Sequence, residues 1–304
     1  MENIKSELRK ILTRSIILQF NKNPSKIKTK EMMPLSMTPE DRQRYIDQIQ
    51  NFRLIDDTFF HTCFHDNKSC MEFVIRIILD KPRLKVIRMH TQEEVPNLYG
   101  RSVRFDVFAQ DADGTEYNIE VQKDDNGANP RRARYNASLL DTMNVPSGAD
   151  WKQLPRTIVI FITEHDVLGG GLPIYHVHRT IDELDGKRFG DDTEIIYVNG
   201  QIQNDTMLGH LMHDFFCKNP ADMCSKLLAE RASFFKSNEH GVITMCDIME
   251  KIEKEGFAKG VAETTLKIIR NQLRHHTPYE EISEVTETPL DEVIRIAKES
   301  NLAY

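Results

Sequence analysis

Two runs of alternating polar and apolar residues lie between residues 101 and 122. They flank the turn Asp111-Ala112-Asp113-Gly114, and alternation on both sides of a glycine-containing turn predicts a β-hairpin. Residues 156–163 (RTIVIFIT) form a continuous apolar run, which is typical of a strand covered on both faces. Between these segments, Asn129 and Pro130 provide a capping residue and a first-turn proline, so we expect a helix over 130–141.

This order of elements predicts an α/β fold. The helix at 130–141 is the crossover between two strands of one sheet, and such crossovers return the chain to the same sheet. Other apolar patterns predict strands at 173–179 and 193–200, and helices at 54–80 (with a break near 65–67), 205–217 and 220–237. The expected architecture is a mixed sheet flanked by helices.

The two ends of the chain differ in character from this core. Residues 1–50 are predicted to form a basic helical arm, with a second helix that begins near Thr38-Pro39. Its first thirty residues contain eight Lys or Arg and two Glu, a net charge of +6. This arm is either a solvated segment or a contact for DNA. Residues 51–240 form the predicted core, and residues 241–304 a helical C-terminal region.

The C-terminal region contains two short helices that resemble a helix-turn-helix. They begin at Thr277-Pro278 and Thr288-Pro289, each with an acid at the capping-box position. The second helix starts with Asp291 and Glu292, which would repel phosphates, so packing or oligomerisation is favoured over base reading. We expect this region to be dispensable for chemistry.

The composition is that of a soluble globular protein. The chain has 304 residues, of which 39% are hydrophobic and 29% charged. No segment approaches the roughly 20 apolar residues that span a bilayer. Arg9, Lys10 and Arg14 interrupt the N-terminal apolar residues, which argues against a secretory signal. We therefore expect a cytoplasmic protein without a membrane partner. The net charge of −7 counts mildly against a nucleic-acid binder.

The five cysteines form no Cys-x-x-Cys pair and are expected to be free thiols. His210, His213 and Cys217 lie at helical spacing and could hold zinc. That interpretation is the weaker one, because the sequence indicates no fourth ligand.

The length of the hairpin loop decides whether Asp106 and Glu120 share a face, because side chains alternate along a strand. A two-residue loop would place Asp106 opposite Val121, with the two acids on opposite faces. A three-residue loop, 112–114, places Asp106 opposite Glu120. Such loops favour glycine at their last, left-handed position, which Gly114 occupies. We therefore predict the three-residue register.

Two carboxylates that face each other destabilise a sheet, and a divalent cation would relieve their repulsion. Carboxylate oxygens, a backbone carbonyl and waters suit Mg²⁺, which could activate water toward a phosphodiester. A solvated strand face with scattered acids explains the same pattern, so the spacing alone leaves both interpretations open.

Asp106, Glu120 and Gln122 form the pattern D-x13-E-x-Q across the hairpin, and a helix with the sequence RRARYNASLLD (131–141) follows. In this order, together with DDTFFHTCF (56–64) and VIFITEHDVLGGGLPIYHVHR (159–179), the chain resembles the PD-(D/E)XK nuclease superfamily. More narrowly, it resembles the nuclease-family transposases and recombination-promoting nucleases. The resemblance covers approximately residues 50–240.

The resemblance implies a restriction-endonuclease-like fold and a nuclease core at 51–240, with Asp106 and Glu120 as metal ligands. It implies that Gln122 replaces the superfamily's lysine, and that an acid of the preceding helix, Asp57 or its neighbour Asp56, assists. The implied cofactor is Mg²⁺, with Mn²⁺ as the alternative ion. An amide does not ionise, so Gln122 cannot act as a cationic group. His61 stands where relatives often have lysine, and the chemistry would depend on metal-bound water.

Arg131, Arg132 and Arg134 open the helix that follows the hairpin. Because this helix begins soon after Gln122, we expect at least one of the three to contact phosphate or neutralise developing charge. Solvated surface charge is the alternative interpretation.

Three functions are compatible with these observations. The leading hypothesis is a Mg²⁺-dependent DNA endonuclease linked to transposition or recombination, with DNA as its partner and homo-oligomerisation left open. The second is a catalytically degenerate nuclease-fold protein that binds DNA or a protein partner without cutting, and Gln122 and the acidic net charge keep it open. The third is an unrelated hydrolase that uses the acid pair. Metal-dependent nicking of plasmid DNA would separate the first from the other two.

Overall fold

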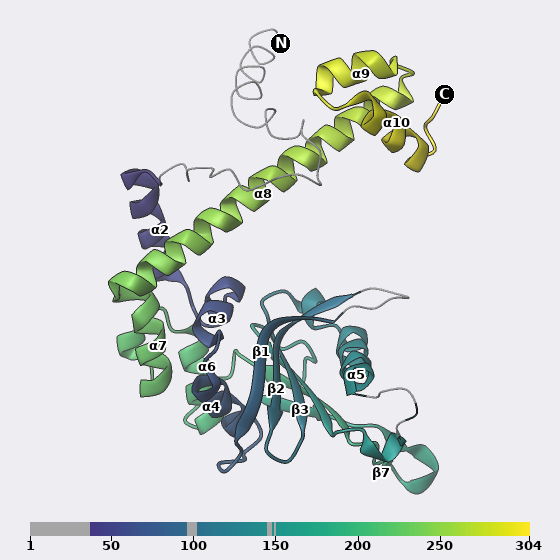
Figure 1. Cartoon of the computed structure of the whole chain (residues 1–304). Coiled ribbons are helices and arrows are strands. Elements are labelled where there is room, and N and C mark those ends of the chain that lie inside the picture. The colour runs from purple at the N-terminus through teal and green to yellow at the C-terminus, as the bar shows by residue number, and fades with distance from the viewer. Residues whose placement is uncertain (1–36, 96–101, 145–147, 149) are drawn as a thin grey trace. The chain divides into compact units, whose positions relative to one another are not determined.

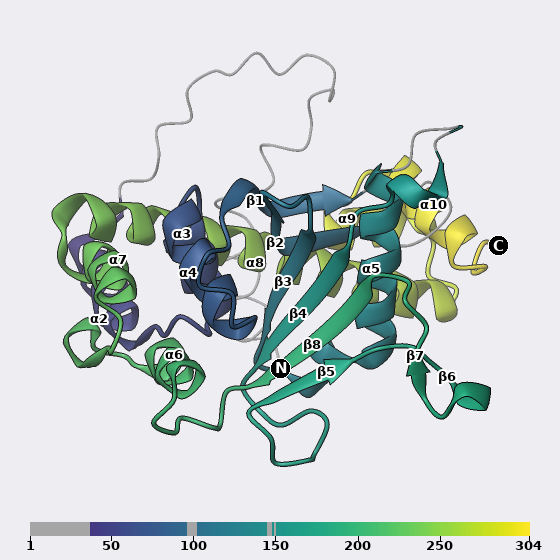
Figure 2. The ribbon, with the colours of Figure 1, turned by 90° about the horizontal axis from the view of Figure 1, so that it is seen from below.

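A computed structural model describes residues 37–95, 102–144, 148 and 150–304 of the chain. A mixed six-stranded sheet with the order β1-β2-β3-β4-β8-β5 forms its centre (Figure 2). β3, β4 and β8 run parallel, and β1, β2 and β5 pair antiparallel to their neighbours. The strands are β1 (Val86–Val95), β2 (Val103–Asp111), β3 (Glu116–Gln122), β4 (Thr157–Thr163), β5 (Ile174–Val177) and β8 (Thr193–Asn199), with β6 (Thr180–Ile181) and β7 (Lys187–Arg188) in a separate ribbon.

Helices cover both faces of this sheet. α5 (Pro130–Asn144) lies on one side, and α3 (Asp57–Phe64) and α4 (Lys68–Ile78) lie on the other (Figure 1). The remaining helices are α2 (Pro39–Asn51), α6 (Met207–Phe216), α7 (Lys226–Ser237), α8 (Glu239–Arg274), α9 (Tyr279–Thr286) and α10 (Leu290–Glu299), with short 3₁₀ turns at η1 (Asp125–Ala128), η2 (Trp151–Gln153), η3 (Asp182–Leu184) and η4 (Pro220–Asp222). The predicted fold class is confirmed: a mixed sheet is flanked by helices and followed by a helical C-terminal region.

The crossover from β3 through α5 to β4 is the predicted one. β3 and β4 are parallel neighbours, with Glu120 opposite Phe161. Every residue of β4 is buried, as expected for an apolar run between two helical layers. Ala133, Ala137 and Leu140 of α5 pack against this strand and the sheet around it. The small alanine side chains let α5 approach the sheet closely.

The predicted helix at 54–80 is two helices. α3 ends at Phe64, and Asn67 caps α4 by accepting a hydrogen bond from the backbone N–H of Cys70. The expected break near 65–67 is therefore a full helix end. α2 begins at Pro39 as predicted, with the Thr38 hydroxyl accepting from the N–H of Asp41. The predictions for the first 36 residues lie outside the described residues.

Strand β1 was not among the predicted elements. It is an edge strand that pairs only with β2 among the described residues, and most of its described side chains are at least partly exposed. An edge strand of this kind carries little of the apolar signal on which strand prediction depends.

The chain divides into two compact units. Residues 43–246 form the unit that contains the sheet, and residues 247–304 belong to the other, together with residues 37–42. The second unit has a small core of its own, which contains Ile269, Leu273, Ile282, Val293, Ile296 and Ala297. Among the described residues, every helix is too short or too polar to cross a membrane.

Candidate active site

The β2–β3 hairpin has the three-residue register. Val107 pairs with Ile119 and Gln110 with Glu116, which places Asp106 opposite Glu120. Gly114 closes the loop with a φ of +83°, a backbone conformation that favours glycine over residues with a Cβ. The predicted three-residue register is confirmed. Its physical reason is the left-handed backbone conformation at the third loop position, which Gly114 adopts.

Asp106 and Glu120 contact each other's strands directly. The Asp106 Oδ2 atom accepts a hydrogen bond of 3.0 Å from the backbone N–H of Val121. Glu120 Oε1 lies 3.4 Å from the backbone nitrogen of Asp106, which donates to it. The Glu120 side chain is completely buried, whereas that of Asp106 is 13% exposed. Two acids therefore meet where the hairpin opens toward α3.

Helix α3 brings two further groups to Asp106. Asp57 and His61 stand one turn apart on the same helix face. The His61 Nδ1 atom lies 3.3 Å from Asp57 Oδ1, and its Nε2 atom lies 3.5 Å from Asp106 Oδ1. One ligand atom from each of the three residues falls within 4.8 Å of the others. The structure thus places a nitrogen ligand between two carboxylates.

The imidazole of His61 is buried and incompletely satisfied. Neither ring nitrogen has a partner with hydrogen-bond geometry among the described residues, although both lie near a carboxylate. Burial opposes protonation, but the Asp106 and Asp57 carboxylates outweigh it and raise the pKa of His61. Buried polar atoms without partners are unusual and are often explained by a ligand or a water.

The structure separates Asp57 from Asp56, which the sequence left as alternatives. Asp56 accepts from the backbone N–H of Arg53 and pairs with the side chains of Arg53 and Lys123, at 3.2 Å and 2.9 Å. The Lys123 ammonium is therefore paired with Asp56. Asp56 is committed to these cations, and Asp57 is the acid that faces His61 and Asp106.

Arg132 is the arginine of α5 that reaches this site. Its guanidinium lies 2.5 Å from Glu120 Oε2 and also donates to the carbonyl oxygen of Gly127, at 2.8 Å. Arg131 and Arg134 are exposed. Arg132 and Asn136 are four residues apart, so they share the helix face that packs on β3.

Asn118 and Asn136 complete a buried network beneath Glu120. Asn136 donates to Asn118 at 2.9 Å, and Asn118 donates to Glu120 Oε1 at 2.8 Å. Burial and the nearby Asp106 carboxylate raise the pKa of Glu120 to about 7, against the opposing effects of Arg132 and Asn118. Sequence analysis missed both asparagines. Strand alternation was the available signal for Asn118, which shares a face with Glu120.

Gln122 lies beside the η1 turn. A Cβ atom at Gly127 would fall 1.9 Å from Gln122 Oε1, so only glycine permits this approach. The same turn presents the Gly127 carbonyl to Arg132. Gln122 therefore packs against the segment that helps to hold Arg132.

Comparison with known proteins finds one family whose sequence model matches the part of the chain that holds these residues. The sequence model of the PD-(D/E)XK nuclease family transposases matches residues 57–204. Residues 57–204 are therefore similar to that family. The match begins at Asp57 and includes the hairpin, α5 and β4, so it contains every residue of the site described above. No curated protein and no solved structure gives a match.

This match confirms the resemblance stated from the motifs. It agrees with the mixed sheet and flanking helices, and it indicates a nuclease or transposition role for the chain. PD-(D/E)XK nucleases generally use divalent metal ions and act on nucleic acid, which suits a site built from carboxylates.

Proposed function

We propose that this chain is a divalent-metal-dependent DNA endonuclease, with Mg²⁺ or Mn²⁺ held by Asp106 and Glu120. The observation that carries the proposal is the meeting of these two acids across the hairpin, with Asp57 and His61 facing Asp106 from α3. Buried, opposed carboxylates are costly without a cation, and their oxygens are the ligands that Mg²⁺ and Mn²⁺ prefer.

The donor set fits such an ion. Asp106 and Asp57 each offer a carboxylate oxygen, and the unsatisfied His61 nitrogens offer a ligand that Mn²⁺ accepts more readily than Mg²⁺. Glu120 Oε2 is engaged by Arg132, and Oε1 accepts from Asn118 and from the N–H of Asp106, so Glu120 would bind metal only after one of these partners moves. A bound divalent cation would lower the pKa of a water molecule and neutralise charge on the scissile phosphate.

The surrounding side chains support catalysis without an active-site lysine. Arg132 places a permanent positive charge beside Glu120, where it can balance charge that develops on a phosphate. Gln122 cannot ionise and instead positions the η1 turn through its contact with Gly127. Arg131 and Arg134 are exposed at the start of α5, and they contact the DNA backbone in this proposal.

Plasmid nicking tests the proposal. Wild-type protein is incubated with supercoiled plasmid in EDTA, Mg²⁺ or Mn²⁺, and cleavage is expected only with metal. Asp106→Ala and Glu120→Ala should abolish cleavage while circular dichroism shows a folded protein. The matched control is Asp113→Ala, which removes an exposed acid from the hairpin loop. Wild-type rates in both active-site variants would refute the assignment.

A non-cutting protein is the second candidate, and the Arg132–Glu120 pair favours it. Glu120 already has a counter-ion at 2.5 Å and needs no metal for charge balance. In this alternative, the protein would use its nuclease fold to bind DNA or a protein partner without cleaving DNA. DNA binding without nicking in any metal would support this alternative. The first proposal includes a role in transposition or recombination, which rests on the family match. It also includes a cytoplasmic location, which rests on the sequence alone, and it leaves homo-oligomerisation open.

A further inference from the structure

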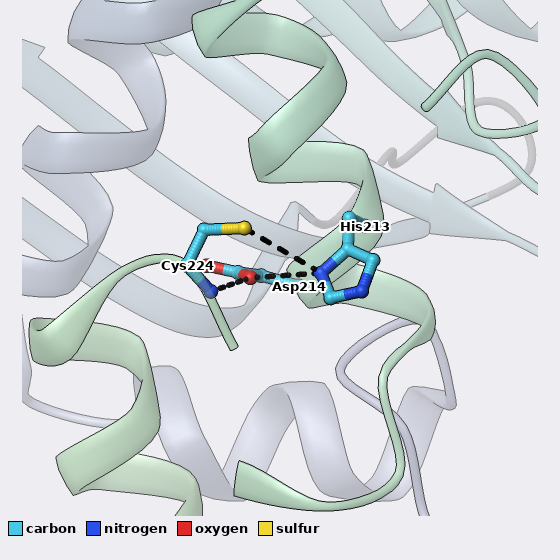
Figure 3. Close-up of side chains that lie close together, drawn as sticks. All are labelled: His213, Asp214 and Cys224. Atoms are coloured by element: carbon cyan, nitrogen blue, oxygen red, sulfur yellow. Dashed lines mark hydrogen bonds and ion pairs between the residues drawn. The ribbon is translucent and has the colours of Figure 1, made fainter. Parts of the chain in front are cut away.

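A second cluster of metal-binding side chains lies outside the nuclease site. His213 and Asp214 come from the end of α6, and Cys224 comes from the segment between η4 and α7 (Figure 3). The three side chains point toward one another, and one ligand atom from each lies within 4.8 Å of the others. We propose that these residues bind a zinc ion that ties the α6–α7 connection together.

The distances agree with tetrahedral zinc. Zinc bonds of about 2.3 Å to sulfur and about 2.0–2.1 Å to nitrogen or oxygen would separate sulfur from nitrogen by roughly 3.6 Å, and nitrogen from oxygen by roughly 3.4 Å. Cys224 Sγ lies 3.7 Å from His213 Nδ1, and Asp214 Oδ1 lies 3.4 Å from the same nitrogen. Both separations match edges of a coordination tetrahedron, and the sulfur and the carboxylate oxygen lie within 4.8 Å of each other.

The direction of the contacts argues against a Cys-His-Asp catalytic relay. A relay uses both ring nitrogens, one toward the thiol and the other toward the acid. Here Cys224 and Asp214 both face the Nδ1 atom of His213 (Figure 3). Three ligand atoms that converge in this way share one cation more readily than one proton.

Asp214 is held in place independently of any ion. Its side chain is 1% exposed, and its two oxygens accept hydrogen bonds from the backbone N–H groups of Cys224 and Ser225, at 2.6 Å and 2.8 Å. Cys224 is therefore anchored next to the acid before metal arrives. Because Cys224 is exposed and the His213 side chain is 40% exposed, an ion can enter and water can occupy the fourth position.

The chemistry of these ligands distinguishes this site from the nuclease site. A thiolate with an imidazole selects zinc over Mg²⁺, whereas carboxylate oxygens suit Mg²⁺. The sequence pointed to His210 and Cys217 as partners of His213. The structure directs them elsewhere, because His210 pairs with Asp205 at 2.9 Å and the Cys217 thiol donates to the Asn219 carbonyl at 3.1 Å. Those two residues provide matched controls.

Metal titration of the full-length protein tests this site. After treatment with a chelator, wild-type protein should bind one zinc ion per chain, with a rise in melting temperature. Co²⁺ in place of zinc should give a thiolate-to-metal charge-transfer absorbance. Cys224→Ser and His213→Ala should lose both signals, whereas Cys217→Ser and His210→Ala should keep them. Asp106→Ala should also keep them, which separates this site from the nuclease site.

Three outcomes would overturn the proposal: no stoichiometric zinc in the wild type, unchanged zinc binding in Cys224→Ser, or loss of binding in Cys217→Ser. If a ligand variant does not fold, the wild-type cobalt spectrum decides, because the charge-transfer absorbance requires a thiolate ligand. A cobalt complex without that absorbance would refute the assignment of Cys224.

Discussion

The Arg132 guanidinium lies 2.5 Å from the buried carboxylate of Glu120. Arg132 belongs to the crossover helix and Glu120 to the strand that precedes it, so this ion pair joins α5 to β3 at the centre of the proposed nuclease site. If the proposed function holds, any metal or substrate that enters the site would meet a carboxylate that already has a cationic partner, so the pair should affect both stability and chemistry.

Arg132→Ala should destabilise the protein in a pH-dependent way. The pKa of Glu120 is raised to about 7 even with Arg132 present, and removal of the guanidinium would raise it further. In unfolded protein a glutamate ionises near pH ~4.3. A raised carboxyl pKa costs stability as the pH rises above the unfolded value, because the unfolded chain gives up its proton more readily. The added loss should thus be small near pH 5 and larger at pH 8.

Urea unfolding at pH 5 and pH 8 measures this effect for the metal-free protein. Breaking a buried ion pair typically costs about 3–5 kcal/mol, and protonation of Glu120 keeps the loss below that range at low pH. Arg131→Ala is the control, because its side chain is exposed and should change stability by less than about 0.5 kcal/mol. An equal loss for Arg132→Ala at the two pH values would contradict the predicted role of Glu120.

Asp57→Ala should change the metal requirement of nicking, whereas Asp56→Ala should change the stability of the fold. Asp57 faces His61 and is 70% exposed, so its removal should leave the fold intact and raise the Mg²⁺ or Mn²⁺ concentration for half-maximal nicking about 10–100-fold. Asp56 binds Arg53 and Lys123, so its removal should cost about 1–3 kcal/mol without changing the metal requirement. Metal titrations of nicking, paired with thermal unfolding, distinguish the two. A shifted metal requirement in Asp56→Ala alone would reverse the assignment.

Removal of the C-terminal region should leave nicking intact, but the residue at which the chain is truncated should affect self-association. Deletion of residues 277–304 would expose Ile269 and Leu273 of α8, which are buried in the small C-terminal core. Exposed apolar surface of this kind promotes self-association. Deletion of residues 251–304 removes those side chains and keeps the buried Met245 and Cys246.

Size-exclusion chromatography and nicking assays test the two truncations together. The protein that lacks residues 251–304 should self-associate less than the protein that lacks residues 277–304. Both proteins should nick at wild-type rates per folded molecule. A folded truncation that no longer nicks would make the C-terminal helices part of the nuclease machinery.

The sequence by itself determined the features that depend on local backbone geometry. Gly114 at a left-handed loop position was enough to set the hairpin register and bring Asp106 opposite Glu120. Asn129 and Pro130 were enough to begin the crossover helix at the right residue. The continuous apolar run of β4 was enough to predict a strand between two helical layers. Each signal acts over a few neighbouring residues, and the fold class follows from their order.

Only the tertiary structure decided which of several similar side chains reach a site. Asp57 rather than Asp56 faces Asp106, Arg132 rather than Arg131 or Arg134 reaches Glu120, and Cys224 rather than Cys217 meets His213. Neighbouring residues on a helix differ by about 100° in direction, so the rotation of α3 or α5 against the sheet makes the choice. That rotation is set by packing between segments far apart in the chain, which no local pattern records.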